Sequence, residues 1–357
     1  MRTYIKFIIY NFSKSLLYTT GIVLSLVFVL NLLTELEFFK DINVGINLTL
    51  ILTFLNTPSM LFEVFPFIFL IATQLFFIKL FNNNEIEVFK YSGLKNSSIL
   101  KILSVTSLVI AIFITAVFYN ISSTFKNFYL EIKSKYTSDG KYLAVITNNG
   151  LWIKDIIDNK ILIINSSKLE KNFLINNFIT EFDNNYNVIR NLRSNKIDIK
   201  NKKWIIYDAK IYKKNIYDQI NFLELNTNFN YEQIQNLFSN LSSLNMFQLI
   251  ELRKNYKKLN YSLVEIDIHL LKLLSYPFYL LLMSIFASLI MFRLKRLNSA
   301  TLRISIGLLV SVLIYYINNF FLVMGSTERL SVTFAIFIPL GLLMIMATQM
   351  LRKINEN

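Results

Sequence analysis

Residues 102–125 read ILSVTSLVIAIFITAVFYNISSTF, a run of 24 residues without a charge between Lys101 and Lys126. A helix of about 20 residues crosses the hydrocarbon core of a bilayer, which is roughly 30 Å thick. A charged side chain at the centre of such a helix costs about 2.5–3.5 kcal/mol. The length of this stretch and its lack of charge therefore predict a membrane-spanning helix.

Four other charge-free stretches of similar length predict four more spans, at residues 15–34, 273–292, 304–327 and 330–351. The chain is 54% hydrophobic and only 17% charged, whereas soluble domains carry about a quarter charged residues. This composition argues against an ordinary cytosolic enzyme. The chain has no cysteine and one histidine, His269. That excludes thiolate metal sites and Cys–His catalysis, and no metal site is expected.

A less regular apolar stretch lies at residues 43–78, where Glu63 interrupts it near Pro58 and Pro66. It could hold one long helix or a hairpin of two helices. Short cytoplasmic loops are enriched in Lys and Arg. Residues 1–14, 79–101, 293–303 and the C-terminal tail carry 13 basic residues, whereas the opposite short loops carry only Lys40 and Arg329. One long helix keeps the basic segments on one side, which predicts six spans with both termini in the cytoplasm.

Most of the remaining charge lies between spans three and four. From Lys126 to Lys272 the chain has 22 basic and 15 acidic residues, a net charge of +7. Short segments punctuated by turn residues predict strands at 141–147, 151–156, 160–165, 173–182, 203–213 and 218–225. Residues 245–258 predict an amphipathic helix whose apolar face includes Phe247 and Ile250. We therefore expect an all-β, jellyroll-like domain at 126–262, outside the cytoplasm, between three spans in 1–125 and three in 263–357.

The sequence offers few candidates for catalytic or cofactor-binding residues. The chain has no Gly-rich phosphate loop, so it is not expected to bind ATP or another cofactor. His269 lies at a membrane boundary, where a structural role is the simpler interpretation. Glu63 is the one acidic residue deep in an apolar run. Ionisable residues inside the membrane are functional by default, but Glu63 can also reach the outer headgroup region, so both interpretations stay open.

The inner loop NNNEIEVFKYSGLK, residues 82–95, has the pattern of a short capped helix. Asn84 is a candidate N-cap, Glu85 and Glu87 favour the first turn, and Gly93 suits the C-terminal end. The segment is either a capped turn between two spans or a cytoplasmic helix that docks into a partner. In the second case Glu85 offers a carboxylate to a partner arginine. Val88, Phe89 and Tyr91 would then form an apolar face.

Several segments in order resemble the lipopolysaccharide export permease family LptF/LptG. Residues 32–36 (LLTEL) are similar to the family's first-span exit, and Pro58 with 62–66 (FEVFP) to its second-span pattern. Residues 84–93 resemble its coupling helix. Segment 150–155 (GLWIKD), segment 203–208 (KWIIYD), segment 249–253 (LIELR) and His269 to Pro277 resemble its periplasmic strands, connecting helix and fourth-span entry. Each motif is weak alone, but their order and spacing together are specific over nearly the whole chain.

The resemblance implies a permease subunit of an ATP-driven transporter that moves lipopolysaccharide from the bacterial inner membrane to a periplasmic bridge, with the LptG branch favoured. Its implied partners are an LptF-type permease, a cytoplasmic LptB-type ATPase dimer that binds ATP and Mg, and a bitopic LptC-type protein. No nucleic acid is expected. ATPase coupling is assigned by the resemblance to Glu85, Glu87, Val88, Phe89 and Gly93. A lipid path in the β domain is assigned to Trp152, which is expected on the interior of the jellyroll.

Two departures concern the cations that would meet lipid phosphates. Asn31 and Ser59 stand where some family members carry basic residues, so Lys40, Lys126 and Lys133 are the substitutes we expect. The alternative function is a secondary transporter or channel for another amphiphile that works without an ATPase. Ion-driven carriers usually need more intramembrane charge than this chain offers, which disfavours that alternative.

Overall fold

The computed structural model describes residues 3–40, 42, 44–136, 151–157, 160–170, 172–213, 216–231, 234, 240–258, 262–294 and 299–355. The chain forms two compact units. One comprises Met1–Phe125 together with Val264–Asn357, and the other is Lys126–Leu263. The predicted strand at 141–147 lies outside the described residues.

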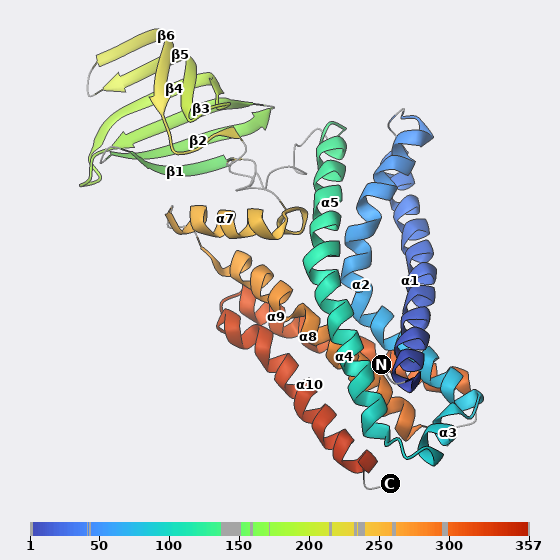
Figure 1. The fold of residues 1–357 in the computed structure, drawn as a ribbon. Coiled ribbons are helices and arrows are strands. Elements are labelled where there is room, and N and C mark those ends of the chain that lie inside the picture. Colours follow the sequence, from blue (N-terminus) through green and yellow to red (C-terminus); the bar gives the residue numbers. More distant parts are fainter. Residues whose placement is uncertain are drawn as a thin grey trace. The chain divides into compact units, whose positions relative to one another are not determined.

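Six described helices are long and apolar enough to cross a membrane (Figure 1). They are α1 (Thr3–Phe38), α2 (Ile46–Asn82), the helix Asn96–Ser134, α8 (Val264–Arg293), α9 (Ala300–Ser326) and α10 (Val332–Asn355). With the β-sheet inserted between the third and fourth of them, they confirm the predicted fold class. Several continue beyond their charge-free stretches, because a helix can extend past the membrane into water.

Helix α2 lies at the centre of its unit, where it packs against α1, α8 and α9. It is one continuous helix although Pro58 and Pro66 lie inside it. Proline has no N–H and so leaves the carbonyl four residues earlier without its helical donor. For Pro66 that carbonyl belongs to Phe62, and the hydroxyl of Tyr276 on α8 donates to it instead. Neighbouring helices can satisfy freed backbone groups in this way.

The third apolar helix changes its winding part-way along. It consists of α4 (Asn96–Phe113), a π-helical turn at Ile114–Phe118, and α5 (Tyr119–Ser134). Tyr119, the first residue after the π turn, places its hydroxyl 3.0 Å from Nε2 of His269 on α8. Its ring also packs on Phe62 of α2, with centroids 5.1 Å apart. The single histidine thus links the third helix to the fourth.

The described residues of the β domain form one antiparallel sheet, whose six strands are paired in the order of the sequence. They are β1 (Leu151–Ile157), β2 (Lys160–Glu170), β3 (Phe173–Phe182), β4 (Val188–Asp198), β5 (Lys203–Lys213) and β6 (Ile216–Asn226). Strand β4 has no counterpart among the predicted strands. Its sequence, VIRNLRSNKID, carries three cations and shows little alternation of apolar and polar residues, so it was not predicted to be a strand.

The buried positions of the middle strands shift by one residue along a line across the sheet. Buried residues are separated by three positions rather than two at Leu174 and Asn177 in β3, and again at Ile206 and Ala209 in β5. Asn176 has φ 53° and Asp208 has φ 50°. Asn and Asp tolerate this left-handed conformation better than most residues. Each strand therefore keeps its apolar side chains on the core side although its alternation changes.

Helix α7 (Met246–Lys258) follows the sheet. Asn245 and Gln248 exchange hydrogen bonds between side chain and backbone, each 2.9 Å, which forms a capping box at its start. The predicted apolar face does not pack within the described chain, because Phe247 is 80% and Ile250 47% exposed, whereas Leu249 and Leu252 are buried. The helix has apolar residues on two sides, and the i, i+3 pair of leucines forms the side that packs.

Candidate functional site

The short helix α3 (Glu85–Tyr91) follows α2 after a two-residue turn. Asn84 occupies the N-cap position, but its φ of 56° is left-handed and its side chain makes no capping hydrogen bond. The expected side-chain cap is therefore wrong, since such a cap requires an extended N-cap residue. Asn83 instead donates from Nδ2 to Oε1 of Glu85 at 3.0 Å. Glu85 Oε2 is buried without a hydrogen-bond partner among the described residues.

Gly93 ends α3 in a Schellman motif. Its φ is 78°, its N–H donates to the Lys90 carbonyl at 2.9 Å, and the N–H of Leu94 donates to the Phe89 carbonyl at 2.9 Å. A left-handed residue at this position favours glycine. The chain can thereby leave α3 and begin α4 at Asn96 within a few residues.

Helix α3 has an inward and an outward face. Ile86 is buried in an apolar cluster with Ile8 and Phe12 of α1 and Phe77 and Leu80 of α2. Phe89, expected on a docking face, also points inward, with its ring edge-to-face with Phe7 at 6.0 Å.

The outward face of α3 is made of Glu87, Val88 and Tyr91, which are exposed; Tyr91 is 90% exposed. The face combines two apolar side chains with a carboxylate. On the opposite side of the helix, Ile86 and Phe89 pack against other helices, so α3 is fixed in place by its inward face.

The three lysines expected near lipid phosphates have different environments. Lys40 is exposed after the end of α1, and Lys126 is half-buried in α5. Lys133 is only 4% exposed, and its Nζ lies 2.7 Å from the hydroxyl of Tyr129. Lys40 belongs to one compact unit, and Lys126 and Lys133 belong to the other. Lys133 therefore lacks the open surface of a phosphate-binding cation.

Asn31 and Ser59, the two uncharged positions for which the lysines were expected to substitute, form part of a buried polar network. Asn31 of α1 donates from Nδ2 to the Thr53 carbonyl at 2.9 Å and accepts from Asn56 Nδ2 at 3.0 Å. Ser59 donates to the Asn56 carbonyl at 3.0 Å. These amides join α1 to α2 without a charge.

Trp152, expected on the interior of the β domain, lies instead on the more open face of the sheet, because the alternation of β1 turns its neighbours to the core. Leu151 and Ile153 of β1 are buried, while Trp152 between them is 53% exposed. The strand register places Trp152 in one row with Asn165, Phe178 and Arg193. The Arg193 guanidinium lies 5.8 Å from the Phe178 ring centroid. Phe178 and Arg193 could not be identified from the sequence, because the row follows only from the register of three strand pairs.

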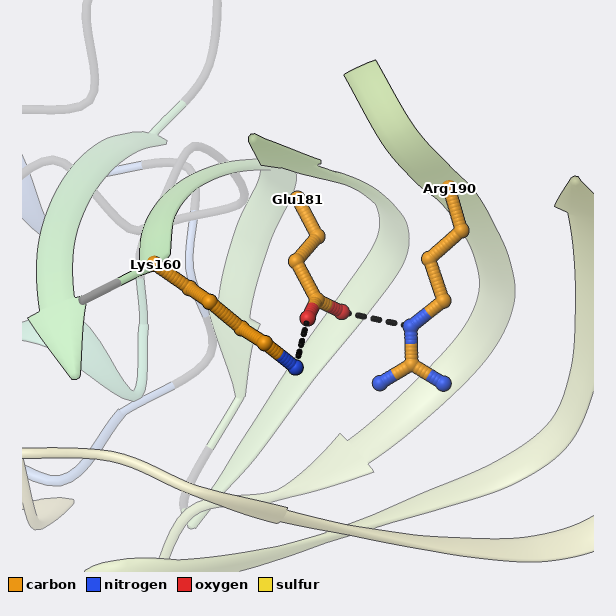
Figure 2. A network of polar contacts seen from close by, with 3 residues as sticks. All are labelled: Lys160, Glu181 and Arg190. Carbon is orange, nitrogen blue, oxygen red and sulfur yellow. Dashed lines mark hydrogen bonds and ion pairs between the residues drawn. The ribbon is translucent and has the colours of Figure 1, made fainter. Parts of the chain in front are cut away.

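On the other face of the sheet, Glu181 lies between two cations, as Figure 2 shows. Its carboxylate is 3% exposed and lies 2.9 Å from Lys160 Nζ and 2.5 Å from Arg190 Nε. Burial raises the pKa of this carboxyl, but the hydrogen bonds and charges of Lys160 and Arg190 outweigh it and hold the pKa below its ordinary value. This triad joins β2, β3 and β4, so its role is structural.

Glu63 lies in the middle of α2 and is exposed rather than packed. It lines a cavity of about 100 Å³ whose walls come from α2, α8, α9 and α10. Glu63 stands out in the sequence, but the other polar residues of this cavity do not, because they lie more than 200 residues later in the chain. Among the described residues, no three His, Asp or Glu side chains are grouped as a metal site requires.

Comparison with known families gives one match. A family model described as "Lipopolysaccharide export system permease LptF/LptG" matches residues 6–353. Comparison with curated proteins gives no match. The matched range includes the helices of both halves, α3 and all six strands. The similarity therefore covers the membrane unit and the β domain together.

Proposed function

Because the chain belongs to the lipopolysaccharide export permease family LptF/LptG, we propose that it is the LptG-type permease subunit of an ATP-driven lipopolysaccharide exporter. Proteins of this family are transporter subunits of the lipopolysaccharide export system, and the chain is a multi-pass membrane protein. In our proposal it extracts lipopolysaccharide from the inner membrane and passes it to a periplasmic bridge. The energy comes from ATP and Mg bound by a partner ATPase.

The observation that carries this proposal is the two-sided packing of α3. Its outward face offers Glu87, Val88 and Tyr91 to a cytoplasmic partner. Its inward residues, Ile86 and Phe89, pack against α1 and α2. Close-packed side chains transmit displacement. A partner that pushes on α3 would therefore move the inner ends of two spanning helices, which can change the width of a cavity between spans.

The proposed partners follow from the family and from this face. An LptB-type ATPase dimer would receive α3, an LptF-type permease would complete the lipid cavity, and an LptC-type protein would accept lipid from the β domain. We propose that both termini lie in the cytoplasm, because the short loops on that side would be the basic ones. The β domain would then be periplasmic.

The lipid path is proposed along the row of Trp152, Phe178 and Arg193 on the open face of the sheet. Aromatic rings can cover acyl chains, and a guanidinium binds phosphate well. Lys40 and Lys126 are the proposed contacts near the membrane. Lys133 is the weakest of the three lysines, because it is buried against Tyr129.

The test is the ATPase activity of the purified complex with and without lipopolysaccharide. We expect Glu85→Arg to lower the lipid-stimulated rate roughly tenfold or more. The change would remove the proposed hydrogen bond between the Glu85 carboxylate and an arginine of the ATPase, and a hydrogen bond to a charged group contributes about 1.5–3 kcal/mol. Glu328→Arg is the matched control, an exposed charge reversal in the turn between α9 and α10. Unchanged stimulation in Glu85→Arg would remove the coupling role. Transport by the chain without any co-purifying ATPase would instead support a secondary transporter.

A further inference from the structure

The cavity beside Glu63 is lined by charged and polar side chains as well as by apolar ones. It lies wholly within the membrane unit, between α2, α8, α9 and α10, and measures about 100 Å³. At about 30 Å³ for each water in the liquid, that is room for on the order of three waters. Its polar lining consists mainly of Glu63, Lys272, Tyr279, Tyr315, Asn318 and Asn319.

Two opposite charges line this cavity without meeting. The Glu63 carboxylate and the Lys272 ammonium, both on exposed residues, make no ion pair or hydrogen bond in the described part of the chain, although the Lys272 backbone carbonyl accepts from the Ser275 hydroxyl at 3.1 Å. Charged side chains within spanning helices usually pair with one another or mark a binding site. An unpaired carboxylate and an unpaired ammonium on one cavity therefore point to a ligand that carries both signs of charge.

A third group independently points to a ligand. The Tyr279 side chain is 8% exposed, and its buried hydroxyl has no hydrogen-bond partner among the described residues. Three positions earlier on α8, the hydroxyl of Tyr276 is satisfied by the Phe62 carbonyl. A buried polar group without a partner is costly and uncommon. The Tyr279 hydroxyl is thus free to bind whatever enters the cavity.

The position of the cavity along the helices sets its depth in a membrane. Glu63 is 16 residues from Lys79, Lys272 is 21 from Arg293 and Asn318 is 15 from Arg303. At 1.5 Å per helical residue these separations are roughly 24, 32 and 23 Å. The hydrocarbon core is about 30 Å thick. The cavity therefore lies near the headgroup level of the leaflet opposite the basic inner loops.

We propose that this cavity binds the phosphoethanolamine headgroup of a phospholipid, at a site distinct from the cargo path. Lys272, the Asn318 and Asn319 amides and the Tyr279 hydroxyl would donate to the phosphate. Glu63 would accept hydrogen bonds from the ammonium, with the Tyr315 ring beside it. A purely anionic headgroup is disfavoured because Glu63 repels it. The proposal stands whether or not the chain works as the exporter proposed above.

The experiment measures lipid retained by the chain purified with its partner subunits. The delipidated protein is incubated with phosphatidylethanolamine or phosphatidylglycerol of identical acyl chains, and retained lipid is counted by mass spectrometry after gel filtration. We expect at least fivefold more phosphatidylethanolamine retained. Glu63→Gln should abolish this preference, and Lys272→Gln should lower retention of phosphatidylethanolamine roughly tenfold. Glu37→Gln and Lys101→Gln, exposed charges outside the cavity, are the matched controls.

A conservative variant separates binding from folding. Tyr279→Phe removes a hydroxyl that has no described partner, so the fold should be unaffected while retention falls about three- to tenfold. Equal retention of both lipids by the unmodified protein would overturn the proposal, and so would unchanged retention in Tyr279→Phe.

Two competitors distinguish the source of the headgroup. Water-soluble phosphoethanolamine at equal concentration should not displace the lipid, because acyl chains contribute to binding in a membrane. Lipopolysaccharide should not displace it either. Displacement by the soluble compound would overturn the assignment to a phospholipid, and displacement by lipopolysaccharide would overturn a site distinct from the cargo path.

Discussion

The hydroxyl of Tyr276 on α8 donates a hydrogen bond to the carbonyl oxygen of Phe62 on α2. That carbonyl is the one that Pro66 leaves without a helical donor. The two rings also stack, with centroids 4.6 Å apart. One tyrosine therefore compensates a proline in another helix and holds two spans together at the same point.

The first prediction concerns this compensation. Tyr276→Phe should lower the free energy of unfolding by about 1–2 kcal/mol, because a buried acceptor is left without a partner. In a Pro66→Ala background the same change should cost less than half as much, since the introduced alanine supplies the N–H that proline lacks. Thermal unfolding in detergent, followed by helical circular dichroism, measures both values. Equal losses in the two backgrounds would contradict the compensation.

The second prediction concerns the end of α3. Gly93→Ala places a Cβ on a residue with φ 78°, which should cost about 1–2 kcal/mol although nothing lies within 4 Å of that Cβ. We expect faster hydrogen–deuterium exchange of the Glu85–Tyr91 amides. Gly45→Ala is the control, because Gly45 has φ −65° and equally open surroundings. If both variants exchange alike, the Schellman motif does not hold α3.

The third prediction concerns the pH dependence of the β domain. The pKa of Glu181 is lowered in the fold, so its contribution is present above the unfolded pKa of about 4.3 and is lost as pH falls through the folded pKa. Stability should therefore fall on acidification below about pH 4.5. Glu181→Gln should flatten this part of the profile and, at neutral pH, lower stability by about 1–3 kcal/mol.

Tryptophan fluorescence can follow this transition in the intact chain, because its two tryptophans, Trp152 and Trp204, both lie in the β domain. Glu170→Gln is the matched control. Glu170 pairs with Lys168, but both side chains are more than half exposed, and exposed pairs contribute little. A Glu181→Gln profile parallel to that of the unmodified protein would rule out the triad as the cause.

The fourth prediction concerns the contact between α2 and α9. A Cβ at Gly307 would lie 1.9 Å from Nε2 of Gln74, the atom that donates to the Arg303 carbonyl at 3.0 Å. Gly307→Ala should therefore displace Gln74 and destabilise the membrane unit by about 1–3 kcal/mol. Gly341→Ala on α10 meets nothing within 4 Å and should be neutral or slightly stabilising. Equal melting temperatures for the two variants would contradict this close approach.

The membrane helices were predictable because a single charge in a lipid-facing helix is costly. The charge-free stretches that follow Lys14, Lys101 and Lys272 therefore carry a signal in composition alone. The π turn before Tyr119 was not predictable, since nothing in ITAVF distinguishes it from an α-helical turn. Strand β4 was missed for a different reason. Arg190 is held by Glu181, and that pairing exists only after the sheet has formed.

The candidate site was predictable in part. The segment Asn84–Gly93 has a recognisable pattern, and the structure contains a helix there with Gly93 as its end. The inward direction of Phe89 was not predictable, because it depends on Phe7 near the start of the chain. The cavity residues were likewise hidden, since Glu63 and Asn318 come together only through the packing of α2 and α9.

The inward packing of Ile86 and Phe89 has a consequence for chimaeric permeases. A graft of Glu85–Tyr91 from one relative to another carries along two side chains that must fit the host's own first and second helices. Exchanging only Glu87, Val88 and Tyr91 would transfer the surface while keeping the host's anchor. The outward residues and the inward residues are thus different members of one seven-residue helix, so the surface and its anchor can be exchanged separately.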